Sequence, residues 1–154
     1  MLAESEPIEI SIPSIKVSSS FENLGIGANG EVEAPADPDQ VGWFTGAHTP
    51  GSPGVGVVAG HVTWNRRPTV FFRLGDLKRD DQITVKRRDG SRAVFAVTRM
   101  STIPKDRFPS AEVYRATNVP ELVLITCGGR YSWQQHSYDS NLIVWARVVS
   151  VHRA

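Results

Sequence analysis

The sequence predicts an all-β fold, a barrel or a sandwich of about eight strands joined by short helices. Short apolar runs with the pattern of strands recur along the chain, helical spacing is confined to two brief stretches, and one hairpin signal is clear. The chain of 154 residues has the length of one domain and can bury roughly two-thirds of its unfolded surface.

The first half of the chain holds two strand patterns with a loop-rich stretch between them. Residues 8–12 alternate isoleucine with Glu and Ser, which is the period of a half-buried strand. Residues 18–54 are rich in Ser, Gly, Pro and Asp and predict loops and short strands around the apolar residues 41–44. The run GVGVVAG at 54–60 predicts a buried strand whose glycines allow another backbone to approach closely.

The middle of the chain contains the clearest hairpin. Two β-branched runs, at 83–85 and 93–97, flank Asp89 and Gly90, a dipeptide suited to a tight turn with positive φ. Before the hairpin, the apolar residues within 71–77 have helical spacing and predict a turn or two of helix. The hairpin therefore agrees with an all-β class in which helices only connect strands.

The last third predicts one short helix and two strands. Residues 110–117 fit a helix with Ser110 as its N-cap. The apolar run ELVLIT at 121–126 predicts a central strand that carries Cys127 at its C-terminal end. The β-branched run at 141–151 predicts a final strand.

We expect residues 8–154 to form a single domain that follows a disordered, acidic and polar segment over residues 1–7. No run of 18 apolar residues predicts a helix that crosses a bilayer, and residues 1–7 lack the basic and apolar regions of a secretion signal. The 17 basic and 16 acidic residues leave a net charge of +1, so no overall field favours nucleic acid or a membrane surface. The protein is therefore either cytosolic or held at a membrane by an anchor outside this chain.

Cys127 is the single cysteine, which excludes an intrachain disulfide and a cysteine-rich zinc site. Because the histidines are scattered, we expect no metal and no other cofactor. Gly128 and Gly129 follow directly, so a substrate backbone can approach the thiol closely. Catalysis by this thiol needs a basic group nearby, and the alternative is an inert, buried cysteine.

Four histidines are the candidate partners of the thiol. His152 lies next to the C-terminus and His48 and His136 lie in polar loops, where solvated side chains are typical. His61 directly follows the buried strand predicted at 54–60, so its ring is expected to emerge at a strand end beside the core. His61 is therefore the candidate base, with a structural histidine as the alternative.

Two regions of the sequence resemble the sortases, a family of cysteine transpeptidases. The segments VGWF at 41–44, PG at 50–51 and VVAGH at 57–61 resemble the histidine region of that family, and LITC at 124–127 resembles its cysteine motif. A further set of residues is similar to the actinobacterial class E/F branch in particular: Thr126, Cys127, Gly128, Gly129, Tyr138, Asn141, Val144 and Ala146. The resemblance covers residues 8–149, nearly the whole chain.

The resemblance implies a closed eight-stranded sortase-type β-barrel and a transpeptidase that cleaves an LPXTG-like sorting signal between Thr and Gly. Cys127 would form a thioacyl-enzyme intermediate, which an amine acceptor such as a cell-wall precursor would then release. His61 would protonate the leaving amine and later deprotonate the incoming one, and Thr126 would help to position the oxyanion. The implied location is the extracytoplasmic face of the membrane of a Gram-positive bacterium, with no nucleic-acid partner.

An arginine completes the site in sortases, and here the sequence departs from that pattern. Asn141 stands at the position where the family usually has the arginine. We expect Arg130 to be the third catalytic residue, because it lies three residues after Cys127 and starts a predicted loop that can return over the thiol. Arg147 is expected to face away, on the side of the final strand opposite Ala146. The alternative is that Asn141 supports the oxyanion while Arg130 is solvated.

Two other functions stay open at this point. The missing arginine at position 141 is compatible with a peptide-binding module that has kept the barrel and lost the activity. A thiol hydrolase would use the same Cys127–His61 pair and transfer the acyl group to water. The basic run at 86–88 flanks the hairpin tip and is typical of a solvated face.

Overall fold

The computed structural model describes residues 2–26, 33–132 and 137–154, and their side chains except those of residues 105, 127–132 and 137–139. The described strands are β1 (Pro7–Ile12), β2 (Val17–Leu24), β3 (Val41–Phe44), β4 (Gly54–Gly60), β5 (Thr63–Trp64), β6 (Arg67–Pro68), β7 (Gln82–Arg87), β8 (Arg92–Pro104), β9 (Pro120–Ser132) and β10 (Ser137–His152). The described helices are short: η1 (Pro13–Ile15), η2 (Leu74–Asp76), η3 (Lys105–Arg107) and α1 (Ser110–Val113).

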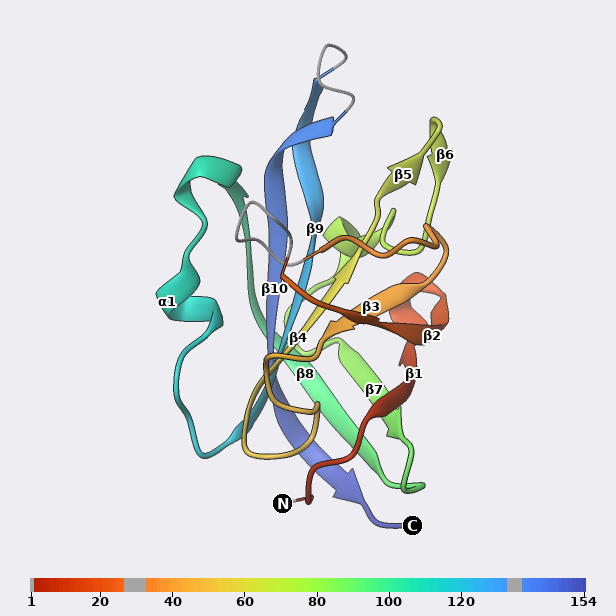
Figure 1. The fold of residues 1–154 in the computed structure, drawn as a ribbon, viewed down its shortest axis with the longest axis vertical. Coiled ribbons are helices and arrows are strands. Elements are labelled where there is room, and N and C mark those ends of the chain that lie inside the picture. The colour runs from red at the N-terminus through yellow and green to blue at the C-terminus, as the bar shows by residue number, and fades with distance from the viewer. Residues whose placement is uncertain (1, 27–32, 133–136) are drawn as a thin grey trace.

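Eight of the described strands close into a barrel in the order β1-β2-β3-β4-β9-β10-β8-β7 (Figure 1). The strands β5 and β6 form a separate two-stranded hairpin. The predicted all-β class and the closed eight-stranded barrel are both confirmed. The predicted hairpin is β7–β8, in which Gly90 has a φ of 87° as the turn requires.

The barrel contains a parallel seam between β4 and β9, whose paired positions run from Gly54↔Pro120 to Gly60↔Thr126. Beyond Thr126, strand β9 leaves β4 and continues along β10 as far as Ser132. The prediction that Cys127 ends its strand is therefore wrong, because β10 extends the pairing. The position predicted as a strand end is instead the end of the parallel seam.

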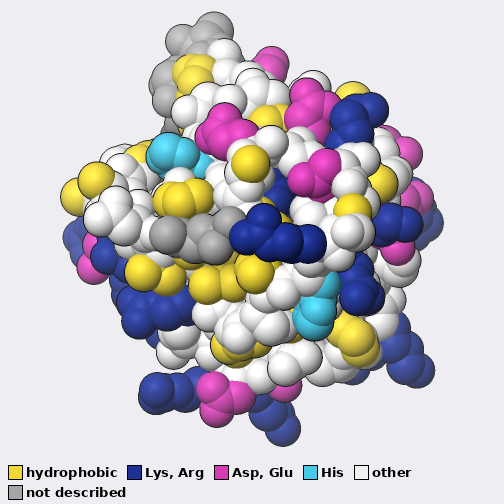
Figure 2. Space-filling view, turned by 90° about the horizontal axis from the view of Figure 1, so that it is seen from below, with side chains coloured by type: hydrophobic (Ala, Val, Ile, Leu, Met, Phe, Trp, Pro, Cys, Tyr) yellow, Lys and Arg dark blue, Asp and Glu magenta, His cyan; other side chains and the backbone are white. Residues whose placement is uncertain are grey.

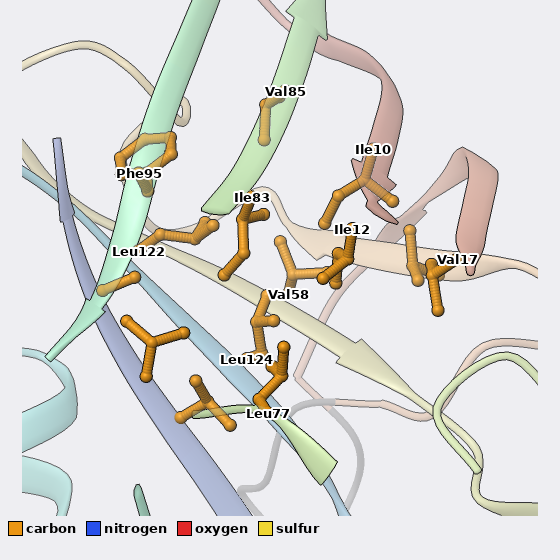
Figure 3. Close-up of a cluster of buried hydrophobic side chains, with 14 of the residues drawn as sticks. Ile10, Ile12, Val17, Val58, Leu77, Ile83, Val85, Phe95, Leu122 and Leu124 are labelled. Atoms are coloured by element: carbon orange, nitrogen blue, oxygen red, sulfur yellow. The ribbon is translucent and has the colours of Figure 1, made fainter. Parts of the chain in front are cut away.

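The interior of the barrel is filled by alternate residues of its strands (Figure 3). On β9, Leu122 and Leu124 belong to this interior cluster, whereas Val123 and Ile125 belong to a second apolar cluster on the outer face. Strand β9 is thus buried on both faces, which is why its sequence is a continuous apolar run rather than an alternating one.

The segment predicted to be disordered, residues 1–7, makes specific contacts over its described part. Leu2 is buried in the interior cluster, and the N–H of Ser5 donates to the hydroxyl of Thr49 at 3.3 Å. The fully buried guanidinium of Arg87 donates to four acceptors: the carbonyl oxygens of Ala3 and Ser5 and the hydroxyls of Ser91 and Thr49. The backbone of this segment thus supplies hydrogen-bond acceptors that a buried cation requires.

Arg87 also corrects the interpretation of the basic run at 86–88 as a uniformly solvated face. Lys86 and Arg88 are exposed, and Arg88 pairs with Glu6 at 2.9 Å. Arg87 points inward because it continues the buried alternation of Ile83 and Val85 along β7. Seen from the end that holds both termini, basic and acidic side chains are interspersed on the surface (Figure 2).

Both predicted helical stretches are shorter than expected. The apolar residues within 71–77 are buried as a helical face would be, except for Phe72, but only Leu74–Asp76 form a 3-10 turn. The helix expected over 110–117 spans only Ser110–Val113, with Pro109 in the N-cap position. Ser110 is therefore the first helical residue, and the prediction that it caps the helix is wrong by one position.

Candidate active site

The end of the parallel seam brings His61 and Cys127 together in the backbone. Gly60 and Thr126 are the last paired residues of β4 and β9, and His61 and Cys127 follow them directly. Neighbouring strands lie about 4.8 Å apart, so the backbone segments that follow β4 and the seam part of β9 start side by side at this point. The seam therefore closes the long sequence separation between the predicted base and the predicted nucleophile.

Asn141 extends this arrangement to a third strand. It is the Cα partner of Cys127 in the antiparallel pairing of β9 with β10. The positions of His61, Cys127 and Asn141 thus form a row at β4, β9 and β10, called the active-site row because it holds the predicted base and the predicted nucleophile. The Asn141 side-chain amide donates to the carbonyl oxygen of Thr126 at 3.3 Å, so it holds the peptide group that immediately precedes Cys127.

The His61 side chain is half-buried and held from two sides. Its Nε2 lies 2.8 Å from the carbonyl oxygen of Pro35, and its ring meets the Trp64 ring edge-on, with centroids 5.3 Å apart. The His61 carbonyl oxygen accepts hydrogen bonds from the hydroxyl of Thr69 and the N–H of Phe71. The imidazole is therefore fixed in one orientation at the end of the row.

Thr126 faces the interior of the barrel, on the side of β9 that also carries Leu124. It is 3% exposed, and among the described residues its Oγ1 has no hydrogen-bond partner. A buried hydroxyl without a hydrogen-bond partner is uncommon in proteins, and it lowers the stability of the fold unless another group forms a hydrogen bond with it. At the end of the seam, the residue directly before the nucleophile position thus carries a buried hydroxyl without a hydrogen-bond partner among the described residues.

The other described histidines lie away from the row. His48 donates its backbone N–H to Val55, near the start of β4 and about 20 Å along the strand from His61. Its exposed ring lies 3.9 Å from a carboxylate oxygen of Glu4. His152 is exposed beside Ser150 at the end of β10, and His136 lies outside the described residues. Of the described histidines, His61 alone stands at the row.

The family model of the Sortase domain matches residues 10–149, most of the chain. The chain belongs to the sortase family. This match confirms the resemblance to the sortases at the level of the family. Sortases are cysteine transpeptidases of the cell envelope of Gram-positive bacteria. The active-site row lies where the predicted histidine region and the predicted cysteine motif of this sequence meet.

Solved sortase structures share the fold of this chain. Sortase A from Corynebacterium diphtheriae is similar with a TM-score of 0.72 and 24% identity, over 96% of this chain and 63% of that protein. Sortase C-1 from Actinomyces oris gives a TM-score of 0.72 and 22% identity, over 94% and 76%. Sortase A from Listeria monocytogenes gives 0.70 and 16%, over 98% and 92%.

The chain therefore spans less than two-thirds of the Corynebacterium protein and most of the Listeria protein. No curated protein matches it. Within the described ranges, no helix is long and apolar enough to cross a membrane.

Arg130, expected to complete the sortase site, lies within β9 rather than at the start of a loop. The register of β9 with β10 shifts between Ser140↔Gly128 and Tyr138↔Tyr131, at the position of Arg130. The side chains of Cys127 and Arg130 lie outside the described part of the structure. Arg147 lies about 20 Å along β10 from Asn141, with its guanidinium 3.8 Å from Glu121, so it is removed from the row.

A second buried apolar cluster, on the outer face of the barrel, extends up to the active-site row. It is built on alternate residues of β4, β9 and β10, and the α1 segment covers part of it and adds Val113. The buried members of the cluster are Val55, Val57, Val113, Val123, Ile125, Ile143 and Trp145. The α1 segment is held by ion pairs of Arg115 with Glu121 and of Arg99 with Glu112. The Trp145 ring N–H also donates to the Glu112 carbonyl oxygen at 3.3 Å.

The sequence interpretation missed two residues that hold His61. Trp64 follows His61 by three positions, and an aromatic residue so close in sequence to a candidate base is a signal that the sequence offered. Pro35 contributes only its backbone carbonyl, which has no side-chain pattern and could not be found in that way.

Proposed function

We propose that this chain is a transpeptidase that cleaves an LPXTG-like sorting signal between Thr and Gly and transfers the new carboxyl end to an amine. The observation that carries the proposal is the active-site row, in which the seam between β4 and β9 ends with His61 beside Cys127. A thiol and an imidazole at adjacent strand positions are the pair that nucleophilic acyl transfer requires.

In the first half-reaction, the Cys127 thiolate attacks the carbonyl carbon of the threonine residue in the sorting signal. The tetrahedral intermediate collapses, the bond to the glycine nitrogen breaks, and His61 gives its proton to the leaving amine. The product is a thioester between the threonine carbonyl and the Cys127 sulfur. The C-terminal fragment that begins with glycine leaves as a free amine.

In the second half-reaction, an amine acceptor such as a cell-wall precursor attacks the thioester. His61 takes the proton from the attacking nitrogen, and the sulfur leaves as thiolate. The new amide bond replaces the peptide bond that was broken, so the two half-reactions need no cofactor or oxidant. We propose Arg130 as the donor to the oxyanion, with Thr126 and Asn141 shaping the backbone around Cys127.

The proposed binding area for the sorting signal is the edge of the buried outer-face cluster that lies beside the row. It borders the row through Ile125 and Ile143, the residues two positions before Cys127 and two after Asn141. This position would bring a bound peptide to the thiol. We also propose that the protein belongs to the class E/F branch and works at the extracytoplasmic face of the membrane, through an anchor outside this chain.

The test uses an LPXTG peptide together with triglycine as the amine. We expect mass spectrometry to find the peptide cleaved after threonine and joined to triglycine. A product that carries water in place of triglycine at every amine concentration would replace the transpeptidase by a thiol hydrolase.

A second arm uses a thiol-reactive analogue of the same peptide. We expect it to add once to the protein, at Cys127. Binding of the peptide without reaction of the analogue and without cleavage would instead identify a peptide-binding module.

A further inference from the structure

The contact between His61 and Pro35 determines which imidazole nitrogen carries the hydrogen. The Pro35 carbonyl oxygen lies 2.8 Å from Nε2 and can only accept a hydrogen bond. Nε2 therefore carries the hydrogen. In a neutral imidazole only one nitrogen is protonated, so the lone pair is left on Nδ1.

The peptide group between Pro35 and Ala36 is held at both edges. On one edge, the Ala36 N–H donates to Glu22 Oε1 at 3.0 Å, and on the other edge the Pro35 carbonyl meets His61. The two groups point in opposite directions across a planar trans peptide, so fixing the N–H also aims the carbonyl. The Glu22 carboxylate also accepts the Asp37 N–H through Oε2 at 2.8 Å.

A charged acceptor at the N–H strengthens the carbonyl on the other edge of the same peptide. Hydrogen bonds in a chain polarise one another, and a carboxylate is a stronger acceptor than a neutral group. The hydrogen bonds from the Pro35–Ala36 peptide to Glu22 and from His61 to the same peptide therefore connect a carboxylate to the imidazole through a backbone group. No carboxylate side chain needs to touch the ring.

The same segment, residues 35–39, is tied to the β5–β6 hairpin, which follows His61 in the chain. Arg67 of β6 pairs with Asp39 at 3.0 Å, and the Val70 N–H donates to the Pro38 carbonyl. Trp64 of β5 supplies the edge contact to the ring. The hairpin stands at the same end of the barrel as the extension of β9 and β10 (Figure 1).

We propose that Glu22 is a positioning residue, which acts through the Pro35–Ala36 peptide to hold His61 as the Nε2–H tautomer and leave Nδ1 to exchange the proton. The inference rests on the proposed function, in which His61 is the acid and base. A thiol–imidazole pair works best when a third group orients the imidazole, and here a backbone carbonyl takes that place. The same carbonyl also accepts from Nε2 when the ring is doubly protonated.

The first readout is the tautomer of His61, measured from the two imidazole ¹⁵N shifts. In the wild-type protein we expect the neutral ring to be protonated at Nε2. In Glu22→Ala we expect a mixture of tautomers, and in Glu22→Gln a smaller change, because the amide oxygen still accepts one N–H. Glu6→Ala is the matched control: it removes an exposed carboxylate paired with Arg88, away from the row.

The second readout is the kinetics of transfer with a sorting peptide. We expect Glu22→Ala to lower kcat on the order of tenfold with KM nearly unchanged, as a misaimed base predicts. Glu22→Gln should recover part of kcat, and Glu6→Ala should match the wild type. A wild-type ring protonated at Nδ1 overturns the inference, and so does a Glu22→Ala protein with unchanged tautomer and unchanged kcat.

The two readouts separate this inference from the proposed function. If the wild-type protein shows no transfer activity, the proposed function is wrong. The ¹⁵N shifts would still determine which tautomer His61 adopts. If Glu22→Ala does not fold, the wild-type tautomer and the Glu22→Gln variant decide the question.

Discussion

The two ends of the barrel treat buried polar groups in opposite ways. Near the termini, the Arg87 guanidinium is fully buried and donates to four acceptors. Burial lowers the pKa of Arg87, while the carboxylates of Asp89 and Glu4 oppose that shift. At the end of the seam, Thr126 is almost as buried, but its Oγ1 has no partner among the described residues.

The difference separates a structural polar group from one at a site. The Arg87 contacts close the hairpin end of the barrel against residues 2–6, so a cation there stabilises the fold. Thr126 adjoins the nucleophile position, and its hydroxyl, which has no partner among the described residues, does not stabilise the fold. Changes at the two ends should therefore have opposite effects on stability and activity.

The largest effect on activity, short of removing the thiol, is expected at His61. His61→Ala removes the acid and base and should lower kcat/KM by about 10²–10⁴-fold while the protein stays folded. His48→Ala is the control at the other end of β4 and should leave activity near the wild-type value. Steady-state transfer to triglycine measures both variants. A greater loss in His48→Ala would show that the wrong histidine has been assigned.

At the opposite end, Arg87→Met should lower the free energy of unfolding by about 3–5 kcal/mol, because it leaves several buried acceptors without a donor. Arg88→Met removes only an exposed ion pair with Glu6 and should cost less than about 1 kcal/mol. Urea unfolding measures the difference. If the two variants unfold at the same urea concentration, Arg87 does not have the structural role described here.

The third expected effect concerns the oxyanion. Arg130→Ala should cost about 2–4 kcal/mol in kcat/KM, comparable to loss of an oxyanion donor. Asn141→Ala should cost less, because its amide already donates to the Thr126 carbonyl and carries no charge. The two variants are compared with one sorting peptide. A silent Arg130→Ala together with a crippled Asn141→Ala would assign the role to Asn141.

The smallest effect tests the comparison itself. Thr126→Val replaces the open hydroxyl with a methyl group of similar size and should raise the free energy of unfolding by about 1 kcal/mol. The same change should lower kcat/KM, because Thr126 is proposed to shape the site beside Cys127. Thermal unfolding and transfer kinetics are measured on the same sample. A destabilised and fully active Thr126→Val protein would contradict the distinction drawn between the two ends.

The sequence predicted those parts of the fold that depend on side-chain patterns. Strand β4 and the apolar part of β9 are buried on both faces and therefore appear as continuous apolar runs. The Asp89–Gly90 pair predicted the β7–β8 turn, in which Gly90 has a positive φ. His61 and Cys127 were predicted as the base and the nucleophile because each follows one of those apolar runs.

The parts that the sequence did not predict depend on backbone groups and on register. The carbonyl oxygens that bind Arg87 and the carbonyl that orients His61 leave no trace in residue identity. The inward direction of Arg87 was accessible, since it continues the alternation of Ile83 and Val85, but a run of three basic residues favoured a solvated face. Strand β9 extends past Cys127 because β10 pairs with it, which no local pattern indicates.

The most direct test of the central claim is the intact mass of the protein during turnover with a sorting peptide, for the wild-type chain and for Cys127→Ala. The account predicts that the wild-type protein carries the acyl part of the peptide as a thioester on Cys127, and that triglycine removes it. The Cys127→Ala protein should be folded, carry no adduct and form no product, because the chain has no other thiol. Transfer above background by a well-folded Cys127→Ala protein would contradict the account.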